Sequence, residues 1–250
     1  MSRNFELMQH IGKSLEVFEP EVDREIAPVS VDEDVVVPIR LEGPERDEMA
    51  KLVNRVFLAG AEAPRRVVFM GADAGTGCSR ICAGAAELLA ATAGGRSVCV
   101  VDANLRAPSL HEQFGLENQQ GLTDALLQGG PVRKYISRLA GDKLTLMTAG
   151  SSVEGWQTLL GSQQMQTRIS ELQREYDYIL MDIPPLSVCS DAIALARMSE
   201  GVILVIRAQA TRREVAQQVV KELKSAHVSL LGAILNDRRF PIPESLYQRL

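Results

Sequence analysis

The sequence lacks any run of about 20 apolar residues, the length that a membrane-spanning helix needs. Residues 1–6 also lack the apolar segment that marks a signal peptide. Basic residues are fewer than acidic ones, with 27 Lys and Arg and 32 Asp and Glu, which gives a net charge of −5. We therefore expect a cytoplasmic protein, and not one that binds nucleic acid through bulk positive charge.

Cysteine is scarce, and none of the four cysteines forms a CxxC pair. Three of them lie in or beside expected strands and the helix after the first strand, where a cysteine is usually a small buried hydrophobe. Cys78 and Cys82 lie four residues apart on one helix face. A metal or redox pair is therefore the alternative interpretation of these two.

Residues 1–44 differ in composition from the rest of the chain. A short helical pattern at 5–17 is followed by an acidic stretch punctuated by Pro20, Pro38 and Pro44. Such a composition cannot build a core alone, so we expect a flexible acidic tail, with a docking segment for a partner as the alternative. The remaining residues, 45–250, are long enough for one α/β domain.

Strand and helix patterns alternate from residue 45 onward. Apolar runs typical of strands lie at 67–70, 98–102, 144–148, 178–182, 202–206 and 229–235. Helical patterns lie at 45–58, 78–92, 121–138, 155–174, 189–198 and 211–226. This alternation predicts an α/β fold with a mostly parallel sheet, covered by helices on both faces. Ligands of such folds bind at the carboxyl ends of the strands.

Residues 67–79 read as a strand, a glycine turn and a helix start. Gly77 and Ser79 match the phosphate-binding pattern GxxxxGK[ST], Gly71 lies one residue before the position of its first glycine, and Cys78 stands where the lysine belongs. In that pattern backbone amides cradle phosphates, the lysine neutralises their outer oxygens and the hydroxyl holds magnesium. The sequence therefore predicts a nucleotide site that lacks its cation.

The missing lysine has a large expected effect on chemistry. A lost charge-assisted hydrogen bond costs about 1.5 to 3 kcal/mol, and a missing donor to transition-state charge slows a reaction about a hundred- to a thousandfold. We expect binding to survive better than phosphoryl transfer. Arg80 could lend its charge, although it lies on a different face of the helix from Cys78.

Two aspartates each end an apolar strand. Asp102 closes the strand at 98–102, and Asp182 closes the strand at 178–182 before Pro184 and Pro185. Because parallel strands point one way, their ends meet in one crevice beside the glycine turn. Carboxylates beside a phosphate suit Mg²⁺, with helix capping as the alternative role. Asp102 could also polarise an attacking hydroxyl or water.

Six motifs in the same order resemble the cytoplasmic bacterial tyrosine kinases of capsule and exopolysaccharide synthesis. Besides the glycine turn they are DANLRAPSLHEQF (102–114), NQQGLTDALL (118–127), YDYILMDIPP (176–185), SDAIALA (190–196) and GVILVIRAQATRREV (201–215). The resemblance covers about residues 45–250. It implies a P-loop fold related to the chromosome-partitioning and septum-positioning ATPases.

The resemblance also implies ligands and partners. It implies ATP or ADP with Mg²⁺, autophosphorylation on C-terminal tyrosines, and a membrane chain-length determinant, or polysaccharide co-polymerase, that would hold the protein at the inner face of the cell membrane. Ser79, Asp102 and Asp182 would hold the metal. Asp102, Asp182 and Arg106 would form the catalytic group. The nucleotide would contact Gly75, Thr76, Gly77, Cys78, Ser79 and Arg80.

The chain departs from this family at two further places. The helix that carries ExxRxxR for ring assembly here has Glu48, Lys51 and Asn54, so we expect homo-oligomer formation to be weakened. The C-terminal tyrosine cluster is reduced to Tyr247, which is either a phosphoacceptor or a packing or partner contact.

Several other residues have open roles. His111 is either a helix-start residue satisfied locally or a neighbour of the nucleotide, and Trp156 is expected to be a packing anchor. Arg212 and Arg213 should lie at a helix start on the ligand side. The three remaining tyrosines, Tyr135, Tyr176 and Tyr178, are expected in the core.

Three functions follow from these patterns. The leading one is a nucleotide-binding, kinase-like regulator of polysaccharide synthesis and export, catalytically weakened by Cys78. The alternative is an active tyrosine autokinase that uses Arg80 or a subunit-supplied arginine and phosphorylates Tyr247. A positioning ATPase that binds membrane or DNA is less favoured, because the tail has no basic amphipathic helix of the needed length.

Overall fold

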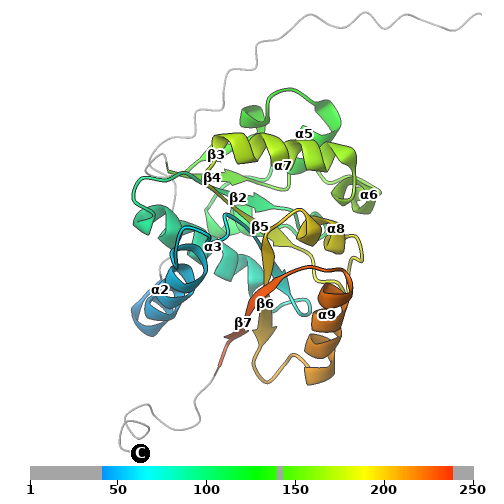
Figure 1. The fold of residues 1–250 in the computed structure, drawn as a ribbon. Coiled ribbons are helices and arrows are strands. Elements are labelled where there is room, and N and C mark those ends of the chain that lie inside the picture. The colour runs from blue at the N-terminus through cyan, green and yellow to red at the C-terminus, as the bar shows by residue number, and fades with distance from the viewer. Residues whose placement is uncertain (1–40, 140–142, 239–250) are drawn as a thin grey trace, which may run out of the picture. The chain divides into compact units, whose positions relative to one another are not determined.

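A seven-stranded sheet forms the centre of the computed structural model, which describes residues 41–139 and 143–238 (Figure 1). The strand order is β3-β4-β2-β5-β1-β6-β7. All neighbours pair in parallel except β3 and β4, so the sheet is mostly parallel, as expected. The strands are β1 (Arg66–Gly71), β2 (Val98–Asp102), β3 (Ser137–Arg138), β4 (Leu144–Met147), β5 (Tyr178–Ile183), β6 (Gly201–Arg207) and β7 (Leu230–Asn236).

Helices cover both faces of the sheet, which confirms the expected α/β architecture (Figure 1). Their bounds are α2 (Gly43–Phe57), α3 (Cys78–Thr92), α4 (Leu110–Gln113), α5 (Leu122–Gln128), the 3-10 turn η2 (Val132–Tyr135), α6 (Trp156–Leu160), α7 (Gln163–Glu175), α8 (Ala192–Arg197) and α9 (Arg213–Ser225). Because successive strand residues point to opposite faces, Val67 and Phe69 pack with α2 and α3, whereas Val68 and Met70 pack in the core that α5, α7, α8 and α9 share.

Two of the expected helices are wrong in extent. The pattern at 121–138 is not one helix, because α5 ends at Gln128 and the chain passes through Gly129 and Gly130, at φ 74° and 83°, into Pro131, η2 and β3. The pattern at 155–174 divides at Gly161, after which the Ser162 side chain caps α7. The short helix α4 contains His111, for which a helix start was one of the two expected roles.

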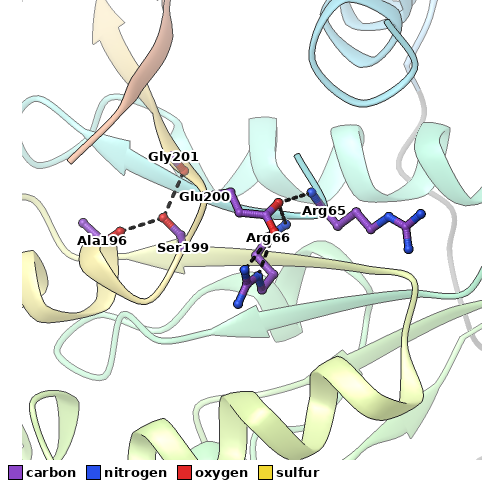
Figure 2. A network of polar contacts seen from close by, with 6 residues as sticks. All are labelled: Arg65, Arg66, Ala196, Ser199, Glu200 and Gly201. Atoms are coloured by element: carbon purple, nitrogen blue, oxygen red, sulfur yellow. Dashed lines mark hydrogen bonds and ion pairs between the residues drawn. The ribbon is translucent and has the colours of Figure 1, made fainter. Parts of the chain in front are cut away.

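One carboxylate links the amino ends of β1 and β6 (Figure 2). The glycine turn lies at the opposite end of β1. Glu200 accepts hydrogen bonds from the backbone amides of Arg65 and Arg66 and from the Arg66 guanidinium. These contacts hold the pKa of Glu200 below its usual value, against the opposing effect of burial. The Arg65 guanidinium points away from Glu200, so this network aligns strands and assembles no pocket.

Several expectations fall on residues outside the described ranges. These include the helical pattern at 5–17, the acidic stretch up to residue 40, and Tyr247. Helix α2 starts at Gly43, slightly before the start expected at residue 45. Among the described residues, no helix has the length and apolarity to cross a membrane.

Candidate functional site

The glycine turn is the loop that links β1 to α3. At three of its positions only glycine fits the backbone conformation or the available space. Gly75 and Gly77 have φ angles of 72° and 79°, in the left-handed region. At Gly71 a Cβ atom would lie 2.5 Å from the Thr76 hydroxyl oxygen and 2.8 Å from the Asp73 carbonyl oxygen. The buried Thr76 side chain thus packs back against Gly71, so Thr76 can offer a ligand its backbone amide.

The loop and the first turn of α3 present open amides. Within the described ranges, the backbone N–H groups of residues 75–80 donate to no protein acceptor, and the first bond back into the loop runs from Ile81 to the Gly77 carbonyl. Such amides at a helix start attract anions. The turn therefore has the backbone chemistry of a phosphate cradle.

Asp182 lies on β5, next to β1, and faces the start of α3. The Ser79 hydroxyl donates to its Oδ2 at 2.5 Å, while its buried Oδ1 has no hydrogen-bond partner within the described part of the chain. Burial raises the pKa of Asp182 to about 7, the neighbouring Asp102 adds to the rise, and the Ser79 hydroxyl and Cys78 thiol oppose it. An unpartnered carboxylate oxygen beside a hydroxyl is a donor set that fits Mg²⁺.

Asp102 stands directly opposite Asp182 in the β2–β5 register. Its Oδ1 accepts from the Asn104 amide at 3.2 Å, and its Oδ2 accepts from the Ser109 and Leu110 amides at 3.0 and 2.9 Å. Burial raises its pKa to about 6, against the lowering effect of these amides. Asp102 therefore anchors the loop into α4, and its expected metal role remains a prediction.

Cys78 is the first residue of α3 and lies close to Asp182. Burial raises the pKa of the Cys78 thiol, and the negative charge of Asp182 raises it further, so the thiol is neutral. No described lysine or arginine forms an ion pair with Asp102 or Asp182. Among the described residues, this pair of buried carboxylates therefore has no countercharge.

The remaining cysteines behave as the sequence suggested. Cys82, Cys99 and Cys189 are buried, and all four are free. Burial raises the pKa of Cys82 well above its usual value. The described residues contain no group of three or more potential ligands that could hold a metal through cysteine or histidine, so the metal interpretation of Cys78 and Cys82 gains no support.

Arg80 points to helix α2 instead of the cradle. Its guanidinium forms three hydrogen bonds with the Glu45 carboxylate, at 2.9 to 3.1 Å. Both side chains are about half exposed. Of the predicted nucleotide contacts, Arg80 is the one whose charged group is engaged elsewhere.

Arg106 lies at the same edge of the sheet, in the loop that follows β2. Strand β5 separates β2 from β1, the strand that leads into the cradle. Arg106 lines a pocket of about 320 Å³ between the loops that follow β2 and β4. Trp156, the expected packing anchor, also lines this pocket and packs against the core. The other lining residues are Leu105, Pro108, Asn118, Gln119, Thr123, Ala149, Gly150, Ser151, Ser152 and Val153.

The structure also places the remaining residues whose roles the sequence left open. Tyr135 and Tyr178 are buried in the core, as expected, and Tyr176 is half-buried. Arg212 and Arg213 lie at the start of α9. His111 lies in α4, but its buried Nδ1 has no partner in the described part of the chain, so the expectation of local satisfaction is wrong for that atom.

Sequence reasoning missed one residue at the cradle. Asn236, the last residue of β7, donates from Nδ2 to the Thr76 carbonyl oxygen at 2.8 Å. A signal for it existed, because Asn236 directly follows the apolar run at 229–235, just as Asp102 and Asp182 end theirs. The strand-end argument applied to carboxylates extends to this amide.

Comparisons with known proteins agree with the site. The ParA family model, described as an NUBPL iron-transfer P-loop NTPase, matches residues 63–248. Tyrosine-protein kinase YwqD of Bacillus subtilis is 31% identical over 186 residues, covering 74% of this chain and 78% of YwqD. A putative tyrosine-protein kinase EpsB of Ralstonia solanacearum is 28% identical over 68% of this chain and 22% of EpsB.

A comparison with solved structures shows a similar fold. The crystal structure of the chimerical protein CapA2B2 superposes with a TM-score of 0.74 at 23% identity, covering 80% of this chain and 87% of that one. The helix-covered parallel sheet, the glycine turn before α3 and the matching family model together identify a P-loop NTPase domain. The chain belongs to the ParA family of P-loop NTPases and, within it, to the bacterial tyrosine kinases of capsule and exopolysaccharide synthesis. It spans about a fifth of the length of EpsB.

Proposed function

We propose that the protein is a nucleotide-binding, kinase-like regulator of exopolysaccharide or capsule synthesis in which phosphoryl transfer is weakened. The observation that carries this proposal is the position of Cys78, the first residue of α3, at the place of the P-loop lysine and close to Asp182. The cradle amides, the Ser79 hydroxyl and the free Asp182 oxygen keep the capacity to hold phosphates and Mg²⁺.

Binding and catalysis should respond differently to the missing cation. Backbone amides hold phosphates in the ground state, whereas a lysine also stabilises the charge that develops on the transferred group. Bound Mg²⁺ would supply part of that charge stabilisation. Residues 75–79 would still orient the phosphates, and nucleotide occupancy would shift the protein between partner-bound and free states through differential affinity.

Calorimetric titration of ATP with Mg²⁺ tests the proposal. We expect weak binding to the wild type and binding about tenfold tighter to Cys78→Lys, an effect of about 1.4 kcal/mol. Thr92→Lys is the matched control, because it adds the same charge at the far, exposed end of α3. Equal affinities for the wild type and Cys78→Lys would contradict the proposed role of Cys78, and an absence of binding to both would contradict a nucleotide site.

An active tyrosine autokinase is the second candidate, favoured by the names of YwqD and EpsB. It requires a replacement cation, either Arg80 released from Glu45 or an arginine from another subunit. Mass spectrometry after incubation with ATP and Mg²⁺ separates the two functions, with Tyr247→Phe as the control. Stoichiometric phosphorylation of Tyr247 in the wild type would support an active kinase and would contradict a regulator with weakened phosphoryl transfer.

We further propose a membrane chain-length determinant, or polysaccharide co-polymerase, as the partner that brings the protein to the inner face of the cell membrane. A relative, ExoP of Rhizobium meliloti, is a succinoglycan biosynthesis transport protein, of which the matched region covers 24%. Co-purification of the tagged protein with such a partner, with and without ATP, tests the proposal. Recovery only in the cytosolic fraction, without the partner, would contradict it.

A further inference from the structure

Asn236 contacts the phosphate loop from a strand that sequence reasoning had not connected to it. Strand β7 forms the edge of the sheet next to β6, whereas the loop follows β1 on the other side of β6. The two residues joined by the bond from Asn236 Nδ2 to the Thr76 carbonyl lie 160 positions apart in sequence. This contact is therefore a tertiary clamp and not a local turn feature.

The chemistry of this contact fixes the orientation of the side chain. A carbonyl oxygen only accepts, so the amide nitrogen of Asn236 must face Thr76. The same nitrogen also occupies the space above Gly77, where a Cβ atom would lie 2.4 Å away from it. Asn236 thus holds the Thr76–Gly77 peptide at the point where Gly77 adopts its left-handed conformation.

The end of β7 is itself pinned. The Asn236 carbonyl accepts from the Ala208 amide at 2.8 Å, and the half-exposed ion pair between Arg207 and the next residue, Asp237, adds little to this backbone bond. A side chain on such an anchored backbone loses little freedom when it makes its bond. Its contact can therefore hold a loop in which the amides of residues 75–80 have no acceptor among the described residues.

We infer that Asn236 is a positioning residue for the phosphate cradle: it fixes the Thr76–Gly77 peptide so that the following amides point to one anion. This inference rests on the proposed nucleotide-binding function. Asn236 would act on the phosphates through the loop and would not read the base. All polyphosphate ligands should therefore depend on it equally, whatever nucleoside they carry.

The test compares ATP with inorganic tripolyphosphate, both with Mg²⁺, by calorimetric titration of the wild type and Asn236→Ala. We expect both affinities to fall by about five- to tenfold, the effect of losing one hydrogen bond. Asn236→Asp keeps the shape but loses the donor, so it should weaken both ligands at least as much. Arg207→Gln is the matched control, because it removes the neighbouring ion pair and should leave both affinities within about twofold.

A ligand-free measurement separates this inference from the proposed function. Hydrogen exchange of the peptide containing residues 72–80 should speed up in Asn236→Ala but not in Arg207→Gln. Faster exchange without any ligand binding in the wild type and Cys78→Lys would support the clamp and refute the nucleotide site. Unchanged exchange and affinity in Asn236→Ala, or a loss confined to ATP, would overturn the inference.

Discussion

The pair of buried carboxylates at the strand ends shows what one substitution changes at the residue scale. Asp102 and Asp182 face each other across β2 and β5, with pKa values raised to about 6 and about 7. Both values exceed the roughly 3.9 of an unfolded aspartate. Protonation therefore favours the folded state, and the stabilisation present below about pH 4 is lost as the pH rises through 6 and 7.

Asp182→Asn should consequently change how stability depends on pH. The variant removes one of the two interacting charges, so we expect its melting temperature to gain a few degrees over the wild type at pH 7.5 and less at pH 5. Thermal unfolding followed by circular dichroism at both pH values measures the difference. Asp191→Asn, at an exposed acid beside α8, is the control and should show no pH-dependent difference. Parallel curves for Asp182→Asn and the wild type would contradict the raised pKa.

The sequence predicted much of the site, because its parts are local. The glycine turn, Cys78, Ser79 and the two strand-end aspartates follow from motif and strand pattern, and the structure brings them together. The partners of Arg80 and Thr76 could not be predicted in this way. Glu45 and Asn236 lie 35 and 160 positions away from them, and only packing places them beside the loop.

At the scale of elements, the strands were predicted better than the helices between them. A strand buried on both faces gives a continuous apolar run, so its ends are sharp in the sequence. The pattern at 121–138 keeps helical spacing through Val132 and Tyr135, which are buried although they belong to a 3-10 turn. Periodicity could not detect the break, but Gly129, Gly130 and Pro131 mark it.

This break is held by a buried arginine from α7. Arg168 donates to the Ala125 carbonyl at 3.0 Å, the Gly130 carbonyl at 2.7 Å and the Glu171 carboxylate at 2.6 Å. It thereby satisfies carbonyls that the end of α5 leaves open. Only 10% of its side chain is exposed, so solvent cannot replace these bonds easily.

We expect Arg168→Ala to lower the free energy of unfolding by about 2 to 4 kcal/mol, since it removes three hydrogen bonds and leaves the buried Ala125 carbonyl and the part-buried Gly130 carbonyl without this donor. Denaturant titration followed by circular dichroism provides the measurement. Arg174→Ala, at an exposed position on the same helix, should change stability by less than about 0.5 kcal/mol. Equal effects of the two variants would show that Arg168 does not support the α5–η2 junction.

At the scale of the whole molecule, helix α2 joins the nucleotide site to an exposed surface. Its buried side, with Met49, Val53 and Phe57, packs in the core shared with α3, and Glu45 holds Arg80. Its outer side carries Glu48, Lys51 and Asn54, at the positions where the sequence resemblance implies a ring motif. Helix α2 therefore contacts the start of α3 on one side and exposes these polar positions on the other.

The geometry of α2 predicts how the protein assembles. Lys51 donates to Glu48 on its own helix at 2.6 Å, and both side chains are largely exposed. An arginine binds a carboxylate through two hydrogen bonds from its planar guanidinium, whereas a lysine presents a single point charge. Asn54 carries no charge. An interface built on arginine contacts should therefore be too weak to close a ring, and the wild type should be monomeric at micromolar concentration.

Lys51→Arg combined with Asn54→Arg restores both forks and should shift the protein to a larger mass in size-exclusion chromatography with light scattering. The matched control makes the same changes on the exposed side of α9, Lys221→Arg with Gln217→Arg, and should remain monomeric. A ring already present in the wild type would show that assembly does not depend on these contacts. If the α2 variant stays monomeric, the α2 surface is not an interface between copies of this chain.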